Sequence, residues 1–229
     1  MITQNLEYLR KLLVGIVFLL LLTVGPAHAQ TIDAEDIPQQ IDLYDVILKY
    51  PQPAWIKGQV VPTALLDQSE FYRDHSGSTF LLEQIPDGEE FESWTRLYAV
   101  AAEELSVGRR ATMREFVALA ADQNELACAE GNFGVQTLRA SETDTMLFMI
   151  CGSTEKASTS IGYGPDVGEA SLWRFLIFED TYVKVYQRWR GPAFDIDARG
   201  RWPVGEPELD DMVQRMTNGI QLFGNVPGQ

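Results

Sequence analysis

Alternation of large apolar side chains in the last third of the 229-residue chain limits the folds open to it more than any other feature. Large apolar residues occupy every second position over 173–177, and valines do so at 183 and 185. A period of two is typical of strands that bury one face of an antiparallel sheet. Because the acidic pair Glu179-Asp180 separates the two stretches, we predict a β-hairpin here.

Two further hairpins are predicted from runs of β-forming residues that flank short polar loops. One joins residues 71–73 and 79–82 through the loop 74–78. The other joins residues 135–139 and 145–151. Pro86-Asp87-Gly88 has the residue types of another tight turn.

Helical periodicity marks other segments. Residues 110–123 place apolar side chains at i, i+3, i+4 and i+7 on one face. Pro207 suits the first position of a final helix. The buried stripe of that helix is predicted to contain Leu209, Met212, Val213, Met216, Ile220 and Phe223. A short amphipathic helix is also predicted over residues 41–49, whereas residues 92–104 fit both helical and strand spacing.

Hairpins gathered into a sheet, with separate helices to cover it, predict an α+β fold built as a layered sandwich. We expect one such domain over residues 65–229. A lead-in over residues 30–64, which contains the short helix, precedes it. About 200 residues can bury one good core, and nothing in the sequence indicates a second domain.

Residues 1–29 have the three parts of a secretory signal peptide. A polar start ends in Arg10-Lys11, the apolar run 12–24 follows, and Ala27-His28-Ala29 forms a cleavage site. The apolar run is shorter than the about 20 residues that a membrane-spanning helix needs. An uncleaved N-terminal membrane anchor is the alternative. We expect a soluble mature chain, in the periplasm or secreted, with no membrane insertion after cleavage.

The balance of charges narrows the expected partners. The chain carries 33 acidic and 18 basic residues, a net charge of −15. Removal of the signal peptide changes this to −16, because it contains one acidic and two basic residues. Such a surface repels phosphate backbones, so nucleic acid is not an expected partner. Solubility in a crowded compartment accounts for the charge, and recognition of a cationic partner is the alternative.

Cys128 and Cys151 are the two cysteines of the chain. In an oxidising compartment an even pair predicts one disulfide, and two separate buried thiols are the alternative. The sequence has no Cys-x-x-Cys motif, which disfavours thiol-redox chemistry.

The segment 80–97 (FLLEQIPDGEEFESWTRL) is the most distinctive of the chain. It resembles a segment of uncharacterised exported bacterial proteins, and the cysteine spacing and the hairpin over 173–190 are also similar. Those proteins in turn resemble the PsbP-like α/β/α sandwiches, the fold of an extrinsic photosystem II subunit. The resemblance covers roughly residues 65–190, and it implies that the Trp94 segment is a strand that follows a loop. It carries no function over, because a shared fold does not fix function.

Basic and aromatic side chains gather on the last predicted hairpin. If they share a face, they form a candidate site for an anionic ligand or a partner protein. The alternatives are a solvated sheet face, or one covered by the acidic last helix. The candidate residues are Arg174, Tyr182, Lys184, Tyr186, Arg188 and Arg190.

Glu83 and His75 are weaker candidates for a ligand-binding, metal-binding or catalytic role. Glu83 interrupts an apolar strand, so it is either a buried ligand group with a raised pKa or an outward-facing carboxylate. His75 is the one histidine left after signal cleavage, which excludes multi-histidine zinc sites. The sequence has no Gly-x-Ser-x-Gly motif either, so no catalytic residue is assigned.

Residues 195–206 nearly match a twelve-residue calcium loop. Asp195, Asp197, Gly200 and Glu206 occupy its first, third, sixth and twelfth positions. Arg199 stands where the fifth position should supply an oxygen ligand, and a strand rather than a helix precedes the loop. An acidic connecting loop is therefore the alternative, and no cofactor is predicted.

Two functions follow as expectations. The favoured one is a non-enzymatic binding or assembly module of the cell envelope, whose partner is an envelope protein or a small ligand. The alternative is a hydrolase of unrecognised type that uses Glu83, His75 or the Asp195/Asp197 loop. Convergence of those groups in one pocket would favour the hydrolase.

Overall fold

The computed structural model describes residues 40–56, 68–106, 109–154 and 166–224. The chain divides into two units, residues 1–30 and 31–229, and every described element belongs to the second unit. The signal-peptide prediction therefore lies outside the described residues. No helix within the described ranges is long and apolar enough to span a membrane.

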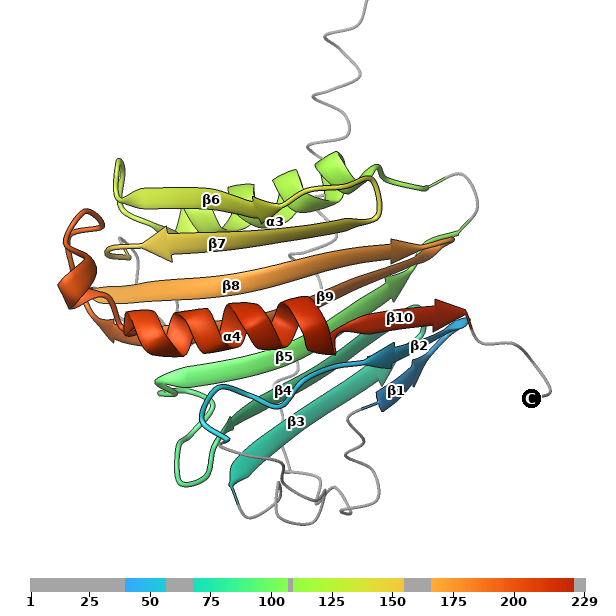
Figure 1. Cartoon of the computed structure of the whole chain (residues 1–229), viewed down its shortest axis with the longest axis horizontal. Coiled ribbons are helices and arrows are strands. Elements are labelled where there is room, and N and C mark those ends of the chain that lie inside the picture. Colours follow the sequence, from blue (N-terminus) through green and yellow to red (C-terminus); the bar gives the residue numbers. More distant parts are fainter. Residues whose placement is uncertain (1–39, 57–67, 107–108, 155–165, 225–229) are drawn as a thin grey trace, which may run out of the picture. The chain divides into compact units, whose positions relative to one another are not determined.

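A seven-stranded antiparallel sheet is the central layer of the described part of the chain (Figure 1). Its strand order is β3-β4-β5-β9-β8-β7-β6. The strands are β3 (Ser69–Ser76), β4 (Thr79–Pro86), β5 (Arg96–Glu104), β6 (Phe133–Arg139), β7 (Asp144–Cys151), β8 (Val167–Phe178) and β9 (Thr181–Pro192). The three predicted hairpins are confirmed as the pairs β3–β4, β6–β7 and β8–β9. The loop of the first hairpin is tighter than expected, two residues long, and starts at Gly77 with φ of 59°.

A second, three-stranded sheet corrects one prediction. It contains β1 (Gln40–Leu43), β2 (Val46–Lys49) and β10 (Gln221–Gly224), in the order β1-β2-β10. The helix predicted over residues 41–49 is therefore wrong. The segment turns back on itself at Tyr44, whose φ is 55°, and its apolar residues alternate on either side of that turn. The N-terminal segment thus packs into the main core and pairs with the C-terminal strand.

Two helices lie on opposite faces of the large sheet (Figure 1). α4 (Glu206–Gly219) buries Met212 and Met216 in the same core as the three-stranded sheet. α3 (Met113–Ala127) buries Met113 and Ala120 against the other face. The result is an α+β sandwich. Of the stripe predicted for the last helix, Phe223 instead lies in β10 and is 43% exposed.

The ambiguous segment around Trp94 is a loop followed by a strand. β5 begins at Arg96, and its alternate residues Tyr98 and Val100 are buried in the α4 core. Leu97 and Ala99 are buried in the α3 core. Because β5 is a central strand with both faces covered, a near-continuous apolar run replaces simple alternation.

Candidate functional site

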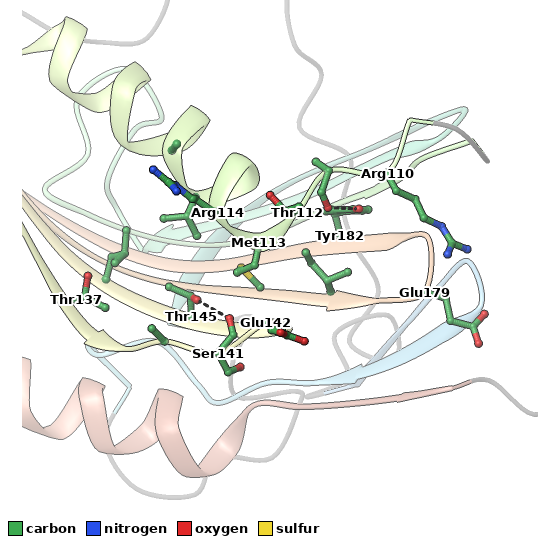
Figure 2. Close-up of a pocket in the computed structure, with 16 residues that line it drawn as sticks. Arg110, Thr112, Met113, Arg114, Thr137, Ser141, Glu142, Thr145, Glu179 and Tyr182 are labelled. Carbon is green, nitrogen blue, oxygen red and sulfur yellow. Dashed lines mark hydrogen bonds between the residues drawn. The ribbon is translucent and has the colours of Figure 1, made fainter.

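An open groove of about 910 Å³ lies where α3 begins (Figure 2). It is bounded by the first turns of α3, by the β6–β7 hairpin and by the β8–β9 turn. The lining comes from residues far apart in the sequence: Arg110, Ala111, Thr112, Met113, Arg114, Val117, Ala118, Thr137, Ala140, Ser141, Glu142, Thr145, Leu147, Ile177, Glu179 and Tyr182.

Local sequence fixes where the helix, and so the groove, begins. The Thr112 hydroxyl accepts a hydrogen bond from the backbone N–H of Glu115, and the Glu115 carboxylate accepts one from the N–H of Thr112. This reciprocal capping box satisfies two donors of the first turn. The Glu115 carboxylate accepts hydrogen bonds from the backbone N–H and the hydroxyl of Thr112, and these hold the pKa of Glu115 below its ordinary value.

A hydrogen bond and an ion pair hold the start of α3 against the β8–β9 hairpin. The Tyr182 hydroxyl donates to the carbonyl of Ala111 over 2.7 Å. Arg110 forms a two-pronged ion pair with Asp180, in which Nη2 and Oδ2 are 3.0 Å apart. The hydrogen bond from Arg110 lowers the pKa of Asp180. The groove is therefore preformed by contacts that do not involve a ligand.

The floor of the groove is apolar, whereas its rims carry charged side chains. Met113 and Leu147 contribute buried apolar side chains to it. Arg114 lies on the helix side, whereas Glu142 and Glu179 lie on the two hairpin turns, as Figure 2 shows. An apolar floor with a few polar groups at its margin is the usual lining of a ligand site.

The structure separates the candidate residues of the β8–β9 hairpin onto two faces. Lys184, Tyr186, Arg188 and Arg190 share the α3 side of β9 through their alternate spacing. Arg174 pairs with Val185 of β9, whose side chain lies in the α4 core. Because directly opposed residues share a face, Arg174 is on the other side of the sheet.

Arg188 and Arg190 are held within the sandwich by a buried carboxylate. Glu169 of β8 is 5% exposed, and its two oxygens accept hydrogen bonds from Nε of Arg188 at 2.6 Å and of Arg190 at 3.2 Å. The guanidinium carbon of Arg190 lies 3.4 Å from the ring centroid of Trp94. This cluster is a charge network inside the fold rather than an open binding surface.

Lys184 and Tyr186 are also packed against aromatic rings. The ammonium nitrogen of Lys184 is 5.9 Å from the ring centroid of Phe116 in α3, and burial lowers the pKa of this lysine. Tyr186 stacks on Trp173 with 4.1 Å between ring centroids. Neither residue lines the groove.

Glu83 projects from β4 on the same side of the sheet as Arg188. Its direct neighbour on β5 is Ala99, in the core beneath α3. Burial raises the pKa of the Glu83 carboxyl, and the charges of Arg188 and Arg190 partly offset this. The carboxyl is therefore half-buried and close to two cations.

Arg174 connects the sheet to the end of α4. Its guanidinium binds both carboxylate oxygens of Asp144, each at 3.0 Å. It also donates to the carbonyls of Met216, Thr217 and Ile220. A cation at the last turn of a helix satisfies carbonyls that lack intrahelical partners and complements the helix dipole.

The calcium-like loop lies after β9, apart from the groove. The Asp195 carboxylate accepts a hydrogen bond from the N–H of Asp197 at 3.0 Å, Arg199–Arg201 form a single 3-10 turn, and Glu206 opens α4. Among the residues that the structure describes, no three His, Cys, Asp or Glu side chains gather as metal ligands do.

The three groups considered for hydrolysis do not converge. His75 is at the exposed end of β3, where its ring meets Tyr44 and Phe80 of the α4 core. Glu83 is on the opposite face, and Asp195 follows the far end of β9. None of them lines the groove.

Cys128 and Cys151 form the predicted pair, with Cα atoms 5.6 Å apart. The bond joins the residue that ends α3 to the last residue of β7. It therefore ties the helix to the sheet at the end away from the groove.

The groove itself was not predicted from the sequence. A signal existed in the capping box Thr112-x-x-Glu115, which marks a helix start, and in the turn residues 141–144. Neither pattern indicates that the two segments meet in space.

No protein-family model matches this sequence, and no curated protein matches it at a significant level. Among solved structures, a point mutant of protein Mog1 and the Ran-binding protein Mog1p of Saccharomyces cerevisiae are similar, each at 12% identity and a TM-score of 0.41. The likeness covers 80% of this chain and 94% and 93% of those chains, respectively. Similarity at this level is too low to carry information about function.

Proposed function

We propose that this protein is an exported, non-enzymatic binding or assembly module of the PsbP-like α/β/α class, and that the groove at the start of α3 is its binding site. The observation that carries the proposal is a preformed groove with an apolar floor and a charged margin. The signal-like residues 1–29 support export.

The separation of the titratable groups supports binding over hydrolysis. General acid–base chemistry needs its groups within hydrogen-bond reach of one substrate. His75, Glu83 and Asp195 are instead on different faces or ends of the sheet. The groove holds neither a histidine nor a cysteine among its lining residues.

In-cell crosslinking of the tagged precursor in its native host tests the proposal. Ala140→Trp fills the groove from an exposed position, and Ala193→Trp places the same ring at an exposed site elsewhere. Wild type and Ala193→Trp are expected to crosslink the same envelope protein or small ligand, and Ala140→Trp to lose about nine-tenths of the product. Equal yields for the two variants, or a wild type that crosslinks nothing, would contradict the proposal.

A further inference from the structure

The two edge strands of the large sheet, β3 and β6, differ in how well their side chains prevent pairing with strands of other molecules. β3 carries Glu70, Arg73, Asp74 and His75 along its eight residues. β6 (FGVQTLR) carries one charge, Arg139, and that side chain is paired with Asp144 at 2.9 Å. Charged side chains on an edge strand prevent pairing with other chains. β6 lacks this protection from Phe133 to Leu138.

The unprotected edge is also exposed and apolar. Val135 is 54% exposed and Leu138 is 38% exposed. In the described part of the chain β6 pairs with β7 on one side and with no strand on the other. A bulge at Leu138 ends the regular register between Thr137 and Arg139. The open stretch is thus the five residues before the bulge.

The edge and the groove form one continuous surface. Thr137 of β6 lines the groove, and its partner on β7 is Leu147 of the groove floor. A strand added beside β6 would place the residue opposite Thr137 on the same face. Its side chain would therefore enter the groove beside α3, while backbone hydrogen bonds run along β6.

We propose that the occupant is an extended, cationic and apolar peptide segment of a partner protein, added as a strand along β6 with a side chain in the groove. This inference rests on the proposed function and names the partner of that site. Strand addition takes affinity from backbone hydrogen bonds and specificity from pockets for alternate side chains.

The net negative charge of the chain favours a cationic peptide over a second copy of the chain as the occupant of the groove. The net charge of −15 makes two copies repel each other, whereas it attracts a cationic segment. The groove margin also holds two arginines: Arg110, which is paired with Asp180, and Arg114 on the helix side. A lysine or arginine of the peptide would therefore approach Glu142 and Glu179 on the hairpin rim. Their carboxylates form no ion pair among the described residues.

The test selects peptides of about ten residues from a random phage-displayed library on the oxidised, exported protein. Enriched sequences are expected to alternate apolar residues and to carry net positive charge. Hydrogen exchange with the best synthetic peptide should slow at residues 133–138 and stay unchanged at β3. Val135→Lys with Leu138→Lys should weaken binding about tenfold. Tyr72→Lys, at a 41% exposed aromatic residue of β3, is the matched control and should bind as wild type does.

Several results would contradict strand addition along β6. Enrichment of acidic peptides, no enrichment, or protection that lies outside both β6 and the groove would overturn the inference. A concentration-dependent dimer that is lost in the double lysine variant would also overturn it, in favour of a second copy. If the library fails while crosslinking through the groove persists, the proposed function survives alone. If both fail, both are wrong.

Discussion

Arg174 of β8 donates two hydrogen bonds of 3.0 Å to the carboxylate of Asp144 on β7. The same guanidinium donates to backbone carbonyls in the last turn of α4. One side chain therefore connects two sheet strands to the helix on their outer face. The side chain of Arg174 is 6% exposed and that of Asp144 is 14% exposed. An interaction shielded from water to this degree depends on both partners.

Replacement of Arg174 should be strongly destabilising. Arg174→Met is expected to lower the free energy of unfolding by about 3 kcal/mol, because it leaves Asp144 and three carbonyls at the end of α4 without their buried donor. Arg139→Met removes the more exposed partner of Asp144 and should cost less than about 1 kcal/mol. Urea denaturation of the exported proteins measures both. Equal losses would show that Arg174 has no special role.

Loss of the disulfide between Cys128 and Cys151 should lower the free energy of unfolding. The bond closes a loop with a sequence separation of 23. Cys128→Ser with Cys151→Ser is therefore expected to lower stability by about 3 kcal/mol, mainly by freeing the unfolded chain. Urea denaturation with and without reductant gives the comparison. An unchanged midpoint on reduction, with alkylation confirming free thiols, would refute this.

The titration of Glu83 should oppose folding as pH rises. Burial raises its pKa in the folded protein, so folding is favoured while the carboxyl is protonated. That contribution is fully present below the unfolded pKa and is lost as pH rises through the folded pKa. Glu83→Gln should gain stability relative to wild type from acid to neutral pH. NMR titration of the Glu83 carboxyl, against the urea-unfolded chain, checks the direction, and a midpoint below the unfolded value would contradict it.

Charge reversal at Arg188 and Arg190 should prevent folding. Arg188→Glu with Arg190→Glu would place two carboxylates against Glu169, which is 5% exposed. We expect little exported protein and loss of near-ultraviolet circular dichroism. Arg199→Glu with Arg201→Glu, at exposed positions, should leave both unchanged. A folded first variant would show that the cluster is not needed for the fold.

Local pattern was sufficient for the three hairpins of the large sheet and for α3 and α4. The alternation in β8 and β9 indicates strands, because successive side chains point to opposite faces wherever the sheet lies. The expectation that only one face of this pair is buried is wrong, since α3 and α4 cover both faces. The capping box that starts α3 and the proline in the first turn of α4 are equally local. The pairing of Cys128 with Cys151 followed because the chain has no other cysteine.

Short segments without a long period were decided by tertiary contacts. Residues 41–49 are too few for periodicity to separate helix from strand. Their hairpin is fixed by pairing with β10, about 170 residues later in the chain. Alternation allows Arg174 to share a face with Lys184 and Arg188, because it gives the side-chain period of each strand but not the register between strands. The register of the β8–β9 ladder instead places Arg174 opposite Val185, on the other face of the sheet.

The sequence by itself determined an acidic, largely antiparallel α+β chain with one cysteine pair and a signal-like start. Only the tertiary structure decided that Arg188 and Arg190 belong to a buried charge network and that α3 meets the β6–β7 hairpin in a groove. The reason is physical. Hydrophobic periodicity reports which side of an element is buried, whereas a site depends on which elements meet, and that is set by packing between distant segments.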